Sequence, residues 1–254
     1  MARDSASTPG DAALPTPSRG RRRQPERRDP PVGWVRLRFT KLGPARFMSA
    51  RDVGRLMERA LKRAQVPVAY SSGFNPHQRV SYAYPAPTGA ASRAEYALVA
   101  LAGDIDAGDL AARLGSQLPD GVRVAATRTD ERHLPPLLEA SVWCLTWRLD
   151  PPDAGALAAA VERFLAAPQV VVERRSKSGV AAQDVRAAVV SLRLASPGPD
   201  DGGLVVVSRQ AEPLIRPGDV LDGLRQFCPI PTAPLLERSA HGTLTPEGRV
   251  LDLP

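Results

Sequence analysis

The chain has 254 residues, a formal net charge of +7 and a hydrophobic content of 43%, enough for one large domain or two of about 100 residues each. No apolar run approaches the ~20 residues of a membrane-spanning helix, and the N-terminus lacks the apolar segment of a signal peptide. We therefore expect a cytoplasmic protein with no membrane contact. Cys144 and Cys228 lie far apart without metal-ligand spacing, which predicts free thiols and no metal site.

The positive charge is concentrated in one part of the chain. Residues 33–94 carry eleven Lys and Arg against two acidic residues, whereas acidic residues outnumber basic ones after residue 94. A local excess of this size indicates an acidic partner, and RNA is the partner we expect.

The first predicted domain covers residues 33–130 and follows a Pro- and Arg-rich segment, residues 1–32, that we expect to be disordered. Alternating apolar and polar residues predict a strand over Trp34–Thr40, with Arg36 and Arg38 on the face away from the core. Ser49 is a suitable cap for a following helix that ends at Pro67. The later predicted elements are strands at Val68–Ser71, Arg79–Tyr84, Glu95–Leu101 and Val122–Ala126, and a helix at Asp106–Leu118.

A linker is predicted at residues 131–140, followed by a second domain at 141–254. Its predicted elements are strands at Val142–Leu149, Val170–Arg174, Val185–Leu194, Leu204–Arg209 and Leu235–Arg238, a helix at Asp153–Ala166 and a helix that begins at Pro217. The same order of elements thus occurs twice. The pattern predicts an α+β protein made of two tandem ferredoxin-like (β-α-β-β-α-β) domains.

The candidate RNA-binding residues lie on the basic helix, the exposed face of the first strand and the Gly73-Phe-Asn-Pro-His77 turn. Cations on the helix face opposite the apolar stripe would contact phosphates, although a merely solvated helix surface has the same pattern. The full set is Arg36, Arg38, Arg46, Arg51, Arg55, Arg59, Lys62, Arg63, Phe74, Asn75, His77 and Arg79. No catalytic residue is assigned, because a lone His without a paired acid is usually structural.

Two further groups of residues have alternative interpretations. Lys177, Asp184, Arg186 and Arg216 form either a second site or structural ion pairs. Arg128-Thr129-Asp130 looks like the catalytic signature of tRNA pseudouridine synthases, but the glycines that flank that signature are missing.

Three motifs stand out in the first half of the chain: Arg46-Phe-Met-Ser49, Gly73-Phe-Asn-Pro-His77 and Pro87-Thr-Gly89. Three later segments are Ser141-Val-Trp143, Asp184-Val-Arg186 and Arg216-Pro-Gly-Asp-Val-Leu221. Together the motifs resemble the radical-SAM-linked family of bacterial domains of unknown function, and the later segments look like its actinobacterial branch. The chain departs from the family pattern at Ala50, Gln78 and Glu237, where His, Pro and Thr are usual. The resemblance implies a partner, a radical-SAM protein of the cobalamin-binding type.

We therefore expect a non-catalytic RNA-binding accessory protein that binds no cofactor itself and acts with a separate radical-SAM enzyme in RNA modification or processing. One alternative is an RNA-modifying enzyme that uses His77 or Asp130. The other is a protein-interaction module whose basic face docks on an acidic surface of its partner.

Overall fold

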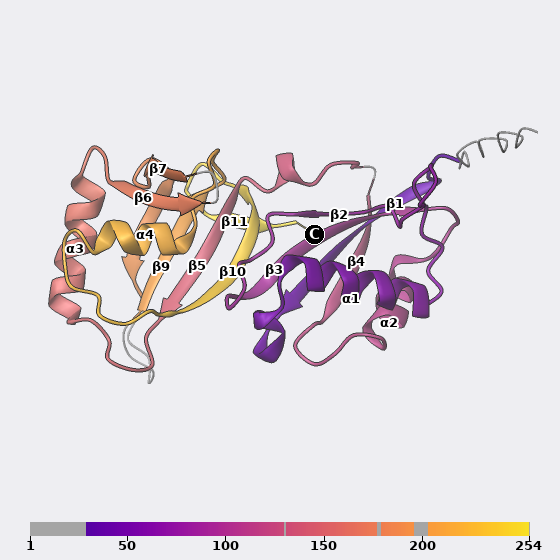
Figure 1. Ribbon diagram of the computed structural model, residues 1–254, viewed down its shortest axis with the longest axis horizontal. Helices are drawn as coiled ribbons and strands as arrows, with labels where there is room; N and C mark the ends of the chain where they lie inside the picture. Colours follow the sequence, from indigo (N-terminus) through magenta and orange to yellow (C-terminus); the bar gives the residue numbers. More distant parts are fainter. Residues whose placement is uncertain (1–28, 130, 177–178, 196–202, 254) are drawn as a thin grey trace, which may run out of the picture.

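The structure, a computed structural model, describes residues 29–129, 131–176, 179–195 and 203–253. Within these ranges the protein has four α-helices and eleven strands, and nine of the strands form one mixed sheet. The sheet extends along the whole molecule, with the N-terminal half at one end and the C-terminal half at the other (Figure 1). The predicted α+β class is confirmed.

The N-terminal half has six main elements in the expected order. They are β1 (Gly33–Lys41), α1 (Ala50–Arg63), β2 (Val80–Ala83), β3 (Ala91–Leu101), α2 (Ala107–Gly115) and β4 (Val124–Thr129). β1 pairs antiparallel with both β4 and β3, and β2 pairs antiparallel with β3. The strand predicted at Val68–Ser71 is wrong: this segment forms only the isolated bridges Val68–Leu101 and Tyr70–Gln78.

Helix α1 begins and packs as its sequence predicts. Ser49 accepts a hydrogen bond from the backbone of Asp52, and the Asp52 carboxylate accepts one from the Ser49 backbone, which completes a capping box. The apolar stripe of α1, which includes Met57 and Leu61, is fully buried against Leu37 and other residues of the sheet. This packing fixes α1 with its Arg-rich face toward solvent.

The C-terminal half contributes the remaining elements. They are β5 (Ala140–Thr146), α3 (Ala154–Ala166), β6 (Val171–Ser176), β7 (Gly179–Asp184), β8 (Val189–Leu194), β9 (Gly203–Arg209), α4 (Pro217–Leu224), β10 (Leu235–Leu244) and β11 (Val250–Asp252). The main sheet continues here in the order β10-β5-β9-β8, while β6 and β7 form a separate two-stranded sheet. Strand β7 was not predicted, because its first four residues are exposed and lack an alternating pattern.

The two halves are joined through β10. Its residues Glu237 and Arg238 pair in parallel with Ala91 and Ser92 of β3, while its other edge pairs antiparallel with β5. Figure 1 shows β10 between the strands of the two halves. The ladder makes one continuous sheet out of two sets of strands.

The sequence predicts an open sheet face opposite α1 and α2, but in the structure this face is covered. Leu134, Leu138 and Leu253 pack there against Tyr96 and Leu98 of β3, and all five side chains are buried. Leu134 and Leu138 flank the short 3-10 helix at Pro135–Leu137, in the segment predicted as a linker. A buried Tyr96 cannot stack on an RNA base.

Within the described residues, no helix combines the length and the apolar composition needed to cross a lipid bilayer.

Candidate functional site

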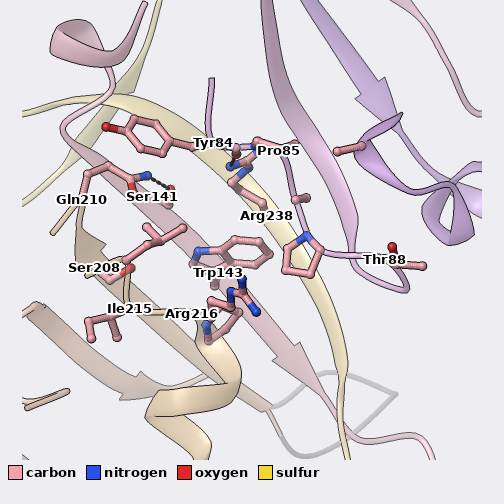
Figure 2. A pocket seen from close by; sticks show the side chains of 15 residues that line it. Tyr84, Pro85, Thr88, Ser141, Trp143, Ser208, Gln210, Ile215, Arg216 and Arg238 are labelled. Atoms are coloured by element: carbon pink, nitrogen blue, oxygen red, sulfur yellow. Dashed lines mark hydrogen bonds between the residues drawn. The ribbon is translucent and has the colours of Figure 1, made fainter. Parts of the chain in front are cut away.

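A cavity of ≈ 470 Å³ lies where the two halves meet. Its walls come from the Tyr84–Thr88 loop and the first residue of α1 on one side, and from β5, β9, β10 and the 214–217 segment on the other (Figure 2). We call it the junction cavity. The lining residues are Ala50, Tyr84, Pro85, Ala86, Pro87, Thr88, Ser141, Trp143, Ser208, Gln210, Leu214, Ile215, Arg216, Pro217 and Arg238.

Buried charges support the loop that forms one wall of this cavity. Arg238 is 2% exposed; its guanidinium pairs with Glu95 and donates to the Tyr84 carbonyl at 2.7 Å. Lys41, also 2% exposed, donates to the carbonyls of Ala86 and Pro87 at 2.9 and 3.0 Å. Two basic side chains and one carboxylate therefore meet behind this wall of the cavity.

The environment of Lys41 disfavours its charged form. Burial lowers the pKa of Lys41 most; Glu95 acts in the opposite direction and Arg238 adds to the lowering. The two backbone carbonyls that accept from its ammonium group partly replace the lost water. Lys41 does not line the junction cavity. Its contacts with the Ala86 and Pro87 carbonyls hold the loop in position.

The backbone of this loop has an uncommon conformation. Tyr84 has a φ of 45°, in the left-handed region that non-glycine residues seldom adopt. The Arg238 guanidinium, bonded to the Tyr84 carbonyl, holds the residue in place. A local backbone cost of this kind persists only where surrounding contacts impose it.

The far wall of the cavity is polar. The Gln210 amide donates to the Ser141 hydroxyl at 3.3 Å, and its nitrogen lies 2.9 Å from Nε2 of the fully buried His241. Since an amide NH₂ only donates, Nε2 of His241 accepts and is unprotonated. Burial, with a smaller contribution from Arg238, lowers the pKa of His241 to about 2.

Trp143 forms part of the wall between the two arginines. The Arg238 guanidinium lies 5.5 Å from the centroid of the Trp143 ring, within cation–π range. Figure 2 shows Arg238 and Arg216 on opposite sides of the Trp143 ring in this view. Arg216, unlike Arg238, is exposed.

The five predicted cations of α1 lie on a second surface, outside the cavity. Within the described residues none of them forms an ion pair. Only the Arg63 guanidinium donates a hydrogen bond there, to the Gln117 carbonyl at 2.9 Å. We call this surface the α1 basic face, and its exposed members are Arg51, Arg55, Arg59, Lys62 and Arg63.

The Gly-Phe-Asn-Pro-His turn lies beyond the C-terminal end of α1, away from the cavity. Phe74 is 69% exposed, and Asn75 is exposed too. His77 is exposed; its Nδ1 lies 2.9 Å from the Ser71 hydroxyl, and its backbone N–H donates to the same oxygen. These contacts close the turn, and Arg79 after it lies 5.6 Å from the Trp34 ring centroid.

The predicted strand arginines differ from the helix arginines in exposure. Arg36 is only 8% exposed, and Arg38 is engaged with Asp252. Both side chains are therefore less available to phosphates than the sequence predicts, since it places them on an exposed face of the strand. The cause is the C-terminal segment of the chain, which returns to this face.

Arg46 lies in a groove near the β3–β10 ladder, which we call the arginine groove. Arg46, Arg93 and Arg148 line it, and Arg93 pairs with Glu237 at 2.5 Å. Phe47 is 60% exposed there, with the Arg46 guanidinium 4.6 Å from its ring centroid. Exposed arginines beside an exposed aromatic ring are a feature of surfaces that bind single-stranded nucleic acid.

The predicted second site is not brought together as a unit. Asp184 accepts from the backbone N–H groups of Val170 and Arg186, and the Arg186 guanidinium donates to the carbonyls of Leu165 and Val189. These are structural contacts within the C-terminal half. Arg216 instead lines the junction cavity, whereas Lys177, and likewise Asp130 of the pseudouridine-synthase hypothesis, lies outside the described residues.

Sequence reasoning missed most residues of the junction cavity. Several of them belong to the motifs that carried the family resemblance: Pro87-Thr88, Ser141, Trp143 and Arg216-Pro217. Ala50, where the resemblance leads us to expect His, also lines it. These motifs lie far apart in the sequence, and none has an evident role in its own segment. That combination could have indicated that they meet in the folded protein.

Fold and site together define an α+β protein with one sheet spanning two halves, a positively charged cavity at their junction and an exposed basic helix. In the described residues, no three His, Cys, Asp or Glu side chains are grouped to hold a metal. The chain belongs to the family described as an uncharacterized protein conserved in bacteria (DUF2344), whose model matches residues 34–217. A search of curated proteins found no match.

Two solved structures show low similarity to the chain. One is an unknown protein from Galdieria sulphuraria, with 15% identity, a TM-score of 0.23, and coverage of 77% of this chain and 91% of that chain. The other is a putative glycine cleavage system transcriptional repressor, with 12% identity, a TM-score of 0.20, and coverage of 76% and 86%. TM-scores this low define neither fold nor function.

Proposed function

We propose that this protein is a non-catalytic RNA-binding accessory protein that acts in the cytoplasm with a separate radical-SAM enzyme in RNA modification or processing. The observation that carries the proposal is the α1 basic face, five exposed cations with no ion pair to any described residue. Cations that are not already neutralised can exchange their counterions for phosphates, which drives nucleic-acid binding.

Two further surfaces extend this RNA-binding surface. The arginine groove adds Arg46, Arg93 and Arg148 beside the exposed Phe47. The turn after α1 adds the exposed Phe74, which offers a ring for base stacking. Because the cations lie on a helix and beside the β3–β10 ladder, they would present a fixed pattern to a folded RNA.

The partner follows from the family resemblance. The motif Gly73-Phe-Asn-Pro-His77 supports placing the chain in the radical-SAM-linked family, and Arg216-Pro-Gly-Asp-Val-Leu221 supports its actinobacterial branch. We infer a radical-SAM protein with a cobalamin-binding domain as the enzyme to which the RNA is presented. In this proposal the radical chemistry belongs to the partner and the present chain supplies recognition.

We also propose that each half is a ferredoxin-like domain. Strand orders β4-β1-β3-β2 and β10-β5-β9-β8, each with two helices between its strands, support this interpretation. The β6–β7 hairpin would then be an insertion in the second domain.

The test is RNA binding by fluorescence anisotropy across a salt series, using total tRNA and a single-stranded oligonucleotide. The variant Arg55→Glu with Arg59→Glu should lower affinity at least about tenfold and reduce the salt slope. The matched control is Arg163→Glu with Arg175→Glu, which changes net charge equally at exposed positions of the C-terminal half.

Equal affinity of wild type and the α1 variant would show that the α1 basic face does not bind RNA. Co-purification of the radical-SAM protein that survives nuclease treatment but requires Arg55 and Arg59 would instead indicate protein docking by this face.

A further inference from the structure

The junction cavity has the size and position of a small-molecule site. Its volume of ≈ 470 Å³ lies within the roughly 300–1,000 Å³ typical of ligand pockets, which often form between domains. Residues of both halves line it, including Ala50 at the start of α1 and Pro217 at the start of α4. A ligand there would contact both halves at once.

The charge of the lining is one-sided. Arg216 and Arg238 both line the cavity, and no Asp or Glu is among its lining residues. Arg238 is balanced by Glu95, but the Arg216 guanidinium has no recorded hydrogen bond or ion pair within the described residues. The nearby Asp219 pairs with the Arg174 guanidinium at 2.8 Å. Its contact with Arg216 is a hydrogen bond from the Arg216 backbone N–H, not from the guanidinium.

Polar groups of the far wall lack partners. Ser208 is 6% exposed, lines the cavity, and has no recorded partner for its hydroxyl in the described part of the chain. Oε1 of Gln210 is buried and likewise has no hydrogen-bond partner. Of these two atoms, the Gln210 oxygen is shielded from water and the Ser208 hydroxyl is not, so the Ser208 hydroxyl is the group that a bound molecule can reach.

The remaining walls are apolar. Pro85, Pro87, Leu214 and Ile215 line the cavity together with Trp143. The lining therefore suits a compact organic molecule with an anionic end, rather than a bare inorganic ion. The Arg216 guanidinium can match the oxygens of a phosphate group in a bidentate geometry.

We propose that the junction cavity binds a phosphomonoester that also carries hydrogen-bond donors, such as a sugar phosphate or a nucleoside 5′-monophosphate. Arg216 binds the phosphate, whereas Arg238, already bonded to Ser92, Tyr84 and Glu95, forms part of the cavity wall. The Ser208 hydroxyl bonds the polar part of the molecule. This site is separate from the α1 basic face and does not depend on RNA binding there.

Isothermal titration calorimetry on the full chain tests the proposal with ribose 5-phosphate, uridine 5′-monophosphate and uridine. The two phosphates should bind saturably, and uridine, which lacks the phosphate, should bind at least about tenfold more weakly. No saturable binding of either phosphate up to about 10 mM would overturn the proposal.

Variants locate the binding. Arg216→Ala removes an exposed side chain and should weaken phosphate binding at least about tenfold without unfolding the protein. Ser208→Ala should weaken it severalfold. Arg163→Ala, at an exposed position of α3 outside the cavity, is the control and should bind as the wild type does. Equal affinity in wild type and Arg216→Ala would overturn the assignment.

A last comparison distinguishes a free metabolite from the end of an RNA chain. A short oligoribonucleotide is measured with a 5′-phosphate and with a 5′-hydroxyl, in wild type and in Arg216→Ala. Preference for the phosphorylated end that Arg216→Ala abolishes would assign the site to RNA ends. Equal binding of the two oligonucleotides, together with Arg216-dependent binding of the free phosphates, would assign it to a metabolite. Loss of RNA binding in the α1 variant alone would leave either outcome intact.

Discussion

The α1 basic face and the buried charges at the junction use the same kind of residue in opposite ways. Arg55 and Arg59 are exposed and have no ion pair within the described residues, whereas Arg238 is 2% exposed and pairs with Glu95. Water screens charges on the first surface, while the second region keeps its charges only because each has a partner. The exposed charges remain available to a binding partner, whereas the buried charges stabilise the fold.

This contrast predicts a very different effect of arginine removal in the two regions. Arg238→Ala leaves Glu95 buried without its partner and also frees the Tyr84 carbonyl. We expect a loss of about 3–5 kcal/mol in the free energy of unfolding, measured by urea denaturation. Replacing both partners, with Glu95→Gln and Arg238→Met, should cost less than the sum of the single changes, because neither member of the pair is left without the other. Additive losses would show that Arg238 and Glu95 are not coupled.

The second prediction concerns the neutral His241 beside the same charges. Its pKa is lowered to about 2 by burial, so below pH 6.5 the unfolded chain gains a proton that the folded chain does not. Stability is therefore lost as pH falls from 6.5, by about 1.4 kcal/mol per pH unit for this group.

Urea unfolding at pH 7 and pH 4.5 tests this sign. Wild type should lose about 2–3 kcal/mol more than His241→Asn between these pH values, since the variant lacks the titrating group. The comparison is made within each protein, so any packing cost of the substitution cancels. The same pH dependence in both proteins would contradict a buried neutral imidazole.

The smallest effect is expected on the α1 basic face. Arg55→Ala with Arg59→Ala removes two exposed cations that make no ion pair to a described residue, so the free energy of unfolding should change by no more than about 0.5 kcal/mol. Thermal and urea denaturation measure it. A loss comparable to that of Arg238→Ala would mean that the helix arginines are structural, and the contrast between the two regions would fail.

Features encoded locally were predictable from the sequence. Ser49 and Asp52 are three residues apart, which is the spacing of a capping box, and the apolar residues of α1 recur at helical intervals. The alternation in β1 likewise revealed a strand with one buried face. These signals depend on neighbours in sequence, so no knowledge of the rest of the fold is needed to interpret them.

Features that depend on distant pairing were not predictable. Nothing around Arg238 indicates that it pairs with Glu95, 143 residues earlier. The cover over Tyr96 by Leu134 and Leu253 is equally non-local, and it is why the expected open sheet face is closed. The cavity was missed for the same reason, since its walls come from both halves. The spread of family motifs along the chain is the signal in the sequence that could have indicated that those segments meet.

The two-residue ladder between β10 and β3 has a consequence for attempts to divide the protein. Each half, if expressed alone, would present strand edges that the other half pairs in the intact chain. Unpaired strand edges are templates for association with other chains. Isolated halves would therefore tend to aggregate, so both halves are best kept on one polypeptide.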